Sequence, residues 1–197
     1  FQTEEFAASA TYFSARWDHK EIYKFWTKPE HSSSPRYGHA RRRLSIVNPI
    51  NQLSVAALLA DNWFTVTQRL KRPSVTEFKP RIVLRGKGRA VTGVDFEEVA
   101  KRKVELLSKF GRYVKTDIAR FYPSIYTHSI AWSIVGKAKA KASHRSAAFK
   151  NSFANKIDAA VSAGQEGQTI GIPIGPDTSR VISELIAVEI EADLLKG

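Results

Sequence analysis

The sequence predicts an α+β fold in which helices and short strands follow one another along one continuous unit. Apolar residues recur at every fourth position from Phe149 to Val161, which is the period of a helix face. Short β-type runs at 82–84 and 112–118 indicate strands. No internal repeat is evident, and 197 residues with 43% hydrophobic content suffice for a sizeable core.

The N-terminal third is predicted to contain two helical segments separated by a loop. Residues 4–26 carry aromatic and aliphatic side chains at mixed spacing, which favours a helix followed by irregular structure. The Ser- and Pro-containing stretch 27–43 is predicted to be a loop. A helix over 48–64 follows, because Asn48 suits the cap position and Pro49 the first turn.

Positive charge is the strongest compositional signal. Lys and Arg number 31 against 19 Asp and Glu, which gives a net charge of +12 and favours a polyanionic partner such as nucleic acid or an anionic surface. The three consecutive arginines Arg41, Arg42 and Arg43 are either a solvated charge run or a set of phosphate contacts.

The stretch 78–93 is predicted to be a basic β-hairpin. A strand-like run leads into a glycine-containing turn, and the arms carry Lys79 and Arg81 among other cations. A Walker-type phosphate loop would need Gly-Lys-Ser or Gly-Lys-Thr, which the letters RGKGRA do not supply.

The helix over 96–110 has the clearest start signal in the chain. Asp95 followed by Glu98 resembles a capping box. A buried stripe is expected from the apolar residues Phe96, Val99, Leu106 and Phe110. A buried strand over 112–118 is predicted to follow directly.

Three further helices are predicted in the C-terminal half. The first begins near 124–127 and ends at Gly136, the second covers 149–164, and the third begins at Asp177 as its N-cap. Its inward side chains are expected to be Ile182, Leu185, Ile186 and Leu194. The lysine-rich run 137–145 is expected to be a flexible electropositive loop.

Composition also limits the cofactors and the cellular location. The chain has no cysteine, and its five histidines are scattered without ligand spacing, so any metal is expected to be a hard ion on oxygen ligands. No apolar run of about eighteen residues occurs, and the N-terminus lacks a signal-peptide pattern, so a cytoplasmic protein is expected. The start at Phe1 and the lack of methionine lead us to expect a piece of a longer protein.

Asp117 stands out because it is a carboxylate near the end of a predicted buried strand. Such a group loses hydration and needs a cation, backbone N–H groups or a metal as compensation. It is either a turn residue that accepts backbone hydrogen bonds or a divalent-cation ligand in phosphoryl or nucleotidyl transfer. No second acid is placed beside it by the sequence.

A Gly- and Pro-rich loop at 171–176 precedes the last helix. Gly171, Pro173 and Gly175 allow the backbone to approach another group closely, and the helix N-terminus offers unpaired N–H groups. The loop is either an ordinary structural turn or a ligand contact.

These segments together resemble reverse transcriptases. VKTDIARFYPSIYTHSI resembles their first palm motif and QTIGIPIGPDTSRVISELI the second. RRRLSIVNPINQLSVAALLADNW and FKPRIVLRGKGR are similar to the fingers segments that precede them. The resemblance covers roughly residues 40–197. The sequences of the motifs are most similar to those of the bacterial enzymes of abortive-infection and antiphage-defence systems.

The resemblance implies a right-hand polymerase, present as the fingers and a partial palm that is truncated before the catalytic Asp-Asp hairpin. Its parts are an N-terminal helical extension (1–39), the fingers (40–111) and the palm (112–197) with a helical insert at 126–164. The implied activity is RNA-directed synthesis of DNA from dNTPs with Mg²⁺, or Mn²⁺ as an alternative. The implied partners are an RNA template and the DNA product in the bacterial cytoplasm, without a membrane. A second copy of the chain and a non-coding RNA are further candidate partners.

The resemblance also assigns roles to single residues. Asp117 matches the catalytic metal-binding aspartate, and the carbonyl of Ile118 helps to hold an ion. Tyr122 matches the ring that packs under the sugar and excludes a 2′-hydroxyl. Further nucleotide contacts are implied for Arg81, Lys79, Phe121 and Gly175. Template or primer contacts are implied for Gly171, Pro173, Ile174, Ser179, Arg41, Arg42 and Arg43.

Two departures from the family pattern broaden the prediction. Ile174 stands where the family usually has Gln, which makes protein-primed or untemplated DNA synthesis an alternative. The Tyr-x-Asp-Asp hairpin is absent, and no Asp-Asp pair occurs, so the 197 residues alone are expected to be inactive. A non-catalytic nucleic-acid-binding subunit is the other alternative.

Overall fold

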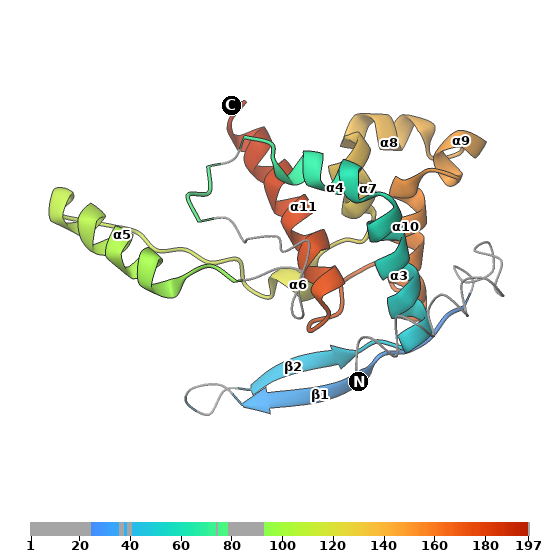
Figure 1. Cartoon of the computed structure of the whole chain (residues 1–197), viewed down its shortest axis with the longest axis horizontal. Helices are drawn as coiled ribbons and strands as arrows, with labels where there is room; N and C mark the ends of the chain where they lie inside the picture. Colours follow the sequence, from blue (N-terminus) through green and yellow to red (C-terminus); the bar gives the residue numbers. More distant parts are fainter. Residues whose placement is uncertain (1–24, 36–37, 39–40, 74, 79–92, 197) are drawn as a thin grey trace.

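The chain folds into a helical body with a two-stranded hairpin at one end and one helix projecting from it, as Figure 1 shows. This computed structural model describes residues 25–35, 38, 41–73, 75–78 and 93–196. The elements are β1 (Glu30–Pro35), β2 (Arg41–Ile46), α3 (Pro49–Asp61), α4 (Trp63–Leu70), α5 (Phe96–Lys109), α6 (Phe121–Ser124), α7 (His128–Val135), α8 (Lys137–Ser143), α9 (Ala147–Lys150), α10 (Phe153–Ala163) and α11 (Asp177–Leu194). The α+β prediction is therefore confirmed.

The body is built around α10, which packs on both α3 and α7, while α11 contacts α3, α4 and α7. Its centre consists of fully or almost fully buried aliphatic side chains: Val66, Ile130, Ile157, Ile182 and Leu185. Because apolar burial is the main favourable term in folding, these helices form the stable part of the molecule. None of the helices in the described part of the chain has both the length and the apolar composition that a membrane crossing requires.

Several predicted helices are confirmed with their caps. Asn48 accepts a hydrogen bond from the Ile50 amide at 3.0 Å, and Pro49 opens α3. Gly136 caps the C-terminal end of α7, and Gly164 that of α10. In α11 the N-cap is Pro176, so Asp177 is the first helical residue instead of the cap. Leu194 is 68% exposed, whereas Ile182, Leu185 and Ile186 are buried as expected.

Two stretches predicted to be loops are regular structure. Residues 30–35 and 41–46 form an antiparallel hairpin in which Glu30 pairs with Ile46 and Pro35 with Arg41. The hairpin is polar and largely exposed, so it lacks the apolar alternation that reveals a strand. The run 137–143 forms α8, because alanine and lysine are both good helix formers.

The prediction that one face of α5 is buried is wrong. Counting the described residues only, no side chain of α5 is buried, and Phe96 and Phe110 are 85% and 60% exposed. Figure 1 shows α5 extending away from the body. Arg102 on α5 forms two hydrogen bonds with the Glu77 carboxylate, at 2.7 and 2.9 Å, and these lower the pKa of Glu77.

The remaining domain predictions are only partly visible. The helix expected over 4–26 and the hairpin expected over 78–93 lie almost entirely outside the described residues. The predicted boundary between the N-terminal extension (1–39) and the fingers (40–111) falls inside the β1–β2 hairpin, because β1 lies before it and β2 after it. The insert over 126–164 contains the helices α7 to α10.

Candidate functional site

The segments around Tyr122 and Gly171, far apart in sequence, are joined along their backbones. The Ile172 amide donates to the Tyr122 carbonyl at 2.9 Å, and the Gly171 amide to the Ile125 carbonyl at 2.7 Å. The Thr127 amide donates to the Thr169 carbonyl at 2.8 Å. The structure therefore places the aromatic turn that follows Asp117 beside the Gly- and Pro-rich loop.

Gly171 lies where this junction is tightest. Its φ is 91°, and a Cβ built on it would lie 3.3 Å from the Pro123 carbonyl oxygen. Glycine is suited to this position because an L side chain is disfavoured at such a φ. The Gln165 side chain donates to the Gly171 carbonyl at 3.0 Å and so holds the loop from the other side.

Three of the residues assigned to template or primer contacts are inside the protein. Gly171, Pro173 and Ser179 are buried, and Ser179 is only 4% exposed. Pro173 and Ser179 line a small internal crevice between α3, α10 and α11. These residues therefore shape the loop from within and present little surface to a ligand.

The accessible end of the loop, residues 174–175, is attached to the β1–β2 hairpin. Ile174 is half-buried, and its carbonyl accepts a hydrogen bond from the Ser45 amide of β2 at 2.7 Å. Gly175 is exposed with φ 137°, and a Cβ there would lie 3.4 Å from the Ser45 carbonyl oxygen. The loop thus connects β2 to the N-terminal end of α11.

The three arginines of β2 differ in what they contact. The Arg41 guanidinium donates to the Ser33 hydroxyl at 2.8 Å and to the Ser33 carbonyl at 3.0 Å, which ties β2 to β1. Arg42 and Arg43 are exposed on the same strand. Of the three, Arg42 and Arg43 are better placed to meet a phosphate.

The buried strand predicted over 112–118 does not form. These residues are exposed and assigned to no strand, and Ile118 is 61% exposed. A strand needs a hydrogen-bonded neighbour, and in the described part of the chain the only sheet consists of β1 and β2. The Asp117 carboxylate is therefore exposed to water, and the burial that first drew attention to it is absent.

The metal site is incomplete among the described residues. In that part of the chain no group of three or more His, Cys, Asp or Glu side chains could hold a metal ion. Asp117 and the Ile118 carbonyl offer oxygen ligands, which suit Mg²⁺. One carboxylate does not fit a two-metal centre.

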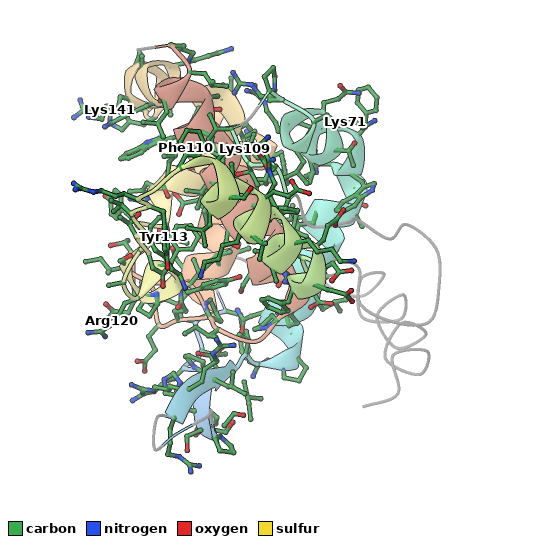
Figure 2. The ribbon with its side chains drawn as sticks, turned by 90° about the vertical axis from the view of Figure 1, so that its left-hand side faces the viewer. Lys71, Lys109, Phe110, Tyr113, Arg120 and Lys141 are labelled. Carbon is green, nitrogen blue, oxygen red and sulfur yellow. The ribbon has the colours of Figure 1, made fainter. Side chains whose placement is uncertain are left out.

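Phe121 and Tyr122 lie at the edge of the core. Their rings meet edge to face with centroids 5.9 Å apart, and both side chains are half-buried. The Tyr122 and Ser183 hydroxyls share a hydrogen bond of 3.1 Å, which links the aromatic turn to α11. Arg120, with φ 55°, precedes α6 and lies at the side of the molecule in Figure 2.

The nucleotide contacts implied for Lys79 and Arg81 cannot be placed, because both residues lie outside the described residues.

The sequence did not predict a further cluster of aromatic side chains. Tyr126, His128 and Trp132 gather on α7 and the turn before it, with ring centroids of Tyr126 4.7 Å from His128 and 5.7 Å from Trp132. The spacing 128, 132 is one helical turn, which could have indicated a shared face.

No protein-family model matches the sequence, and no curated protein matches it.

Proposed function

We propose that this chain provides the fingers and the first part of the palm of an RNA-directed DNA polymerase from a bacterial antiphage-defence system. The resemblance of its two palm-like motifs supports this assignment. The observation that carries it is the backbone junction between the Tyr122 turn and the Gly171 loop. In this proposal the Tyr122 ring and the Gly171 loop, which come from separate segments, meet at one place.

In this proposal each residue has a distinct task. Asp117 is one ligand of a Mg²⁺ site and needs carboxylates beyond those that the described residues bring together. Tyr122 packs against the sugar, while Ile174 and Gly175 contact the base pair. Arg42 and Arg43 contact phosphates of the template or primer.

The proposed reaction extends a primer hydroxyl by one nucleotide. The hydroxyl oxygen attacks the α-phosphorus of a dNTP, a new P–O bond forms, and the bond to pyrophosphate breaks. The hydroxyl passes its proton to water, and pyrophosphate leaves with the electrons of the broken bond. The primer is either a nucleic-acid 3′-hydroxyl or a protein hydroxyl.

Incorporation of labelled dNTP by the full-length protein in Mg²⁺ tests the proposal. Asp117→Asn is expected to lower incorporation about 100-fold or more, because it removes a charge from the reacting centre. Asp193→Asn is the matched control, since Asp193 is an exposed aspartate at the end of α11 that pairs with Lys196. It is expected to incorporate at the wild-type rate.

The RNA requirement divides the outcomes of this assay. Asp117-dependent incorporation that needs added RNA supports templated synthesis, and RNA-independent incorporation supports the untemplated or protein-primed alternative. If no incorporation depends on Asp117 under either condition, the polymerase proposal is rejected.

The second candidate function is a non-catalytic nucleic-acid-binding subunit on the same fold. It is favoured by the exposure of the whole segment 111–120 and by the single carboxylate that it offers. This candidate predicts polynucleotide binding without nucleotide incorporation by the full-length protein.

A further inference from the structure

A surface cluster of rings and cations lies on α7 and α8, and we call it the aromatic-lysine patch: Tyr126, His128, Trp132, Lys137 and Lys141. The Lys137 and Lys141 ammonium groups lie 5.1 and 5.9 Å from the centroid of the Trp132 ring. The Tyr126 ring makes edge-to-face contacts with the His128 and Trp132 rings, and Tyr126 remains 41% exposed. The patch therefore offers both an accessible ring and fixed positive charge.

The surrounding charge is of one sign. The sequence contains no acidic residue from Lys137 to Ile157. Its cations in this stretch are Lys137, Lys139, Lys141, Arg145, Lys150 and Lys156. In the described part of the chain, Lys137, Lys141 and Arg145 form no ion pair, and Lys141 and Arg145 are exposed.

The acid that contacts the patch, Asp158, is already engaged with His128. Asp158 on α10 is 6% exposed, and its Oδ2 lies 2.5 Å from His128 Nδ1. This contact holds the His128 ring in place, and the centroid of that ring lies 4.7 Å from the centroid of the Tyr126 ring. The carboxylate stabilises the ring arrangement and does not neutralise the lysines at the surface.

We propose that the aromatic-lysine patch binds single-stranded nucleic acid. Lys137 and Lys141 contact consecutive phosphates, and a base stacks on the Tyr126 ring. Exposed aromatic rings beside a basic groove are the usual means of binding single strands without sequence preference. A duplex would satisfy only the lysines, because its base faces are already stacked. The proposal does not depend on polymerase activity.

Figure 2 labels Lys141 of the patch and Arg120, the residue before the aromatic turn. Lys141 and Arg120 lie along the same side of the molecule in that view, and Arg120 immediately precedes Phe121. Lys141 and Arg120 therefore face the same side in this view, while Figure 1 shows α8 and α6 at separate places on the molecule.

Fluorescence anisotropy with labelled U12 and dT12 oligonucleotides tests the lysines. Binding is measured in EDTA on full-length protein that carries Asp117→Asn, so that the result is independent of nucleotide incorporation. Replacement of Lys137 and Lys141 by Gln is expected to reduce the slope of log K against log salt by about 1.4, because each phosphate contact to a single strand contributes about 0.7. The preferred oligonucleotide identifies RNA or DNA as the ligand.

The matched control replaces Lys101 and Lys109 on α5 by Gln. This pair makes the same change in net charge on exposed lysines of another helix, and the salt slope is expected to stay at the wild-type value. An equal loss of slope in both double variants would overturn the proposal, because it would show that only net charge matters.

Tyr126→Leu tests stacking, since it keeps an apolar side chain but removes the ring. Single-strand binding is expected to weaken roughly tenfold, while binding of a 12-base-pair duplex stays unchanged. Melting temperature and circular dichroism identify a variant that has lost its fold, and Tyr126→Phe, which keeps the ring, is expected to restore binding. Wild-type affinity in a folded Tyr126→Leu protein, or equal loss for single strand and duplex, would overturn the stacking contact.

Discussion

Gly171 is the residue at which the two segments of the candidate site approach most closely. Gly171→Ala is expected to lower the free energy of unfolding by about 1–3 kcal/mol, because it forces an L side chain into a positive φ and places a Cβ 3.3 Å from the Pro123 carbonyl. Urea unfolding followed by circular dichroism measures the change.

The control for this substitution is Gly111→Ala. A Cβ at Gly111 has no atom within 4 Å and its φ is not positive, so the free energy of unfolding is expected to change by no more than about 0.5 kcal/mol. Equal effects of the two substitutions would show that the junction at Gly171 is not tight.

Glu184 on α11 provides a pH prediction. Burial raises the pKa of its carboxyl above the ordinary value of 4.5, Arg180 opposes that shift, and Glu191 adds to it. The folded protein therefore holds this proton more tightly than the unfolded chain, so the contribution to stability is complete below pH 4.5 and is lost as pH rises through the raised pKa.

Glu184→Gln removes this titration. Relative to the wild type, the variant is expected to gain stability as pH rises from 4 to 7, as measured by chemical denaturation at each pH. A stability difference that stays constant over this range would contradict the assigned shift.

Asp117 illustrates what a residue pattern can and cannot predict. The apolar run before it is typical of a strand, but a strand also needs a partner, and no local pattern shows whether one is adjacent. The sequence therefore identified the acid as unusual for a reason that the structure does not support, since the segment is exposed. Its proposed role now depends on the neighbouring motif and not on burial.

At the scale of single elements, α3 and α5 have similar N-caps but different surroundings. Asn48 caps a helix that packs in the core, and Asp95 accepts from the Glu97 amide at 2.9 Å on a helix without buried residues among those described. Asn48→Ala is expected to lower the free energy of global unfolding by about 1 kcal/mol. Urea denaturation monitors this loss.

Asp95→Ala is expected to act locally. It should speed amide hydrogen exchange in the first turns of α5 while leaving the urea midpoint of the helical body nearly unchanged. A loss of global stability as large as that of Asn48→Ala would show that α5 folds cooperatively with the body.

Element prediction succeeded where caps and breakers mark the ends of helices, as at Asn48, Asp95, Gly136 and Gly164. It failed for the β1–β2 hairpin, whose strands are mostly polar and exposed, and for α8, whose lysines suggested a loop. On α5 the periodicity correctly indicated one apolar face, but periodicity does not show whether another element covers that face. Only the α5 error concerns the surroundings of an element; α8 was missed although its alanines and lysines are good helix formers.

At the scale of the whole molecule, the candidate site depends on long-range contacts. Resemblance pointed to Tyr122 and the Gly171 loop as functional partners, and the structure joins them by backbone hydrogen bonds. The hydrogen bond between Ser45 and Ile174, which attaches the hairpin to this loop, could not be read from any local pattern. The net charge of +12 agrees with a polyanionic partner but does not locate its binding surface.

The central claim is that these joined segments form one deoxynucleotide site with Tyr122 against the sugar. The most direct measurement is the ratio of UTP to dTTP incorporation by full-length Tyr122→Val, with Tyr122→Phe as the control that keeps the ring and loses only its hydroxyl. The account predicts a ratio raised by about tenfold or more in Tyr122→Val and unchanged in Tyr122→Phe. A wild-type ratio in a Tyr122→Val protein that still incorporates nucleotides would contradict it.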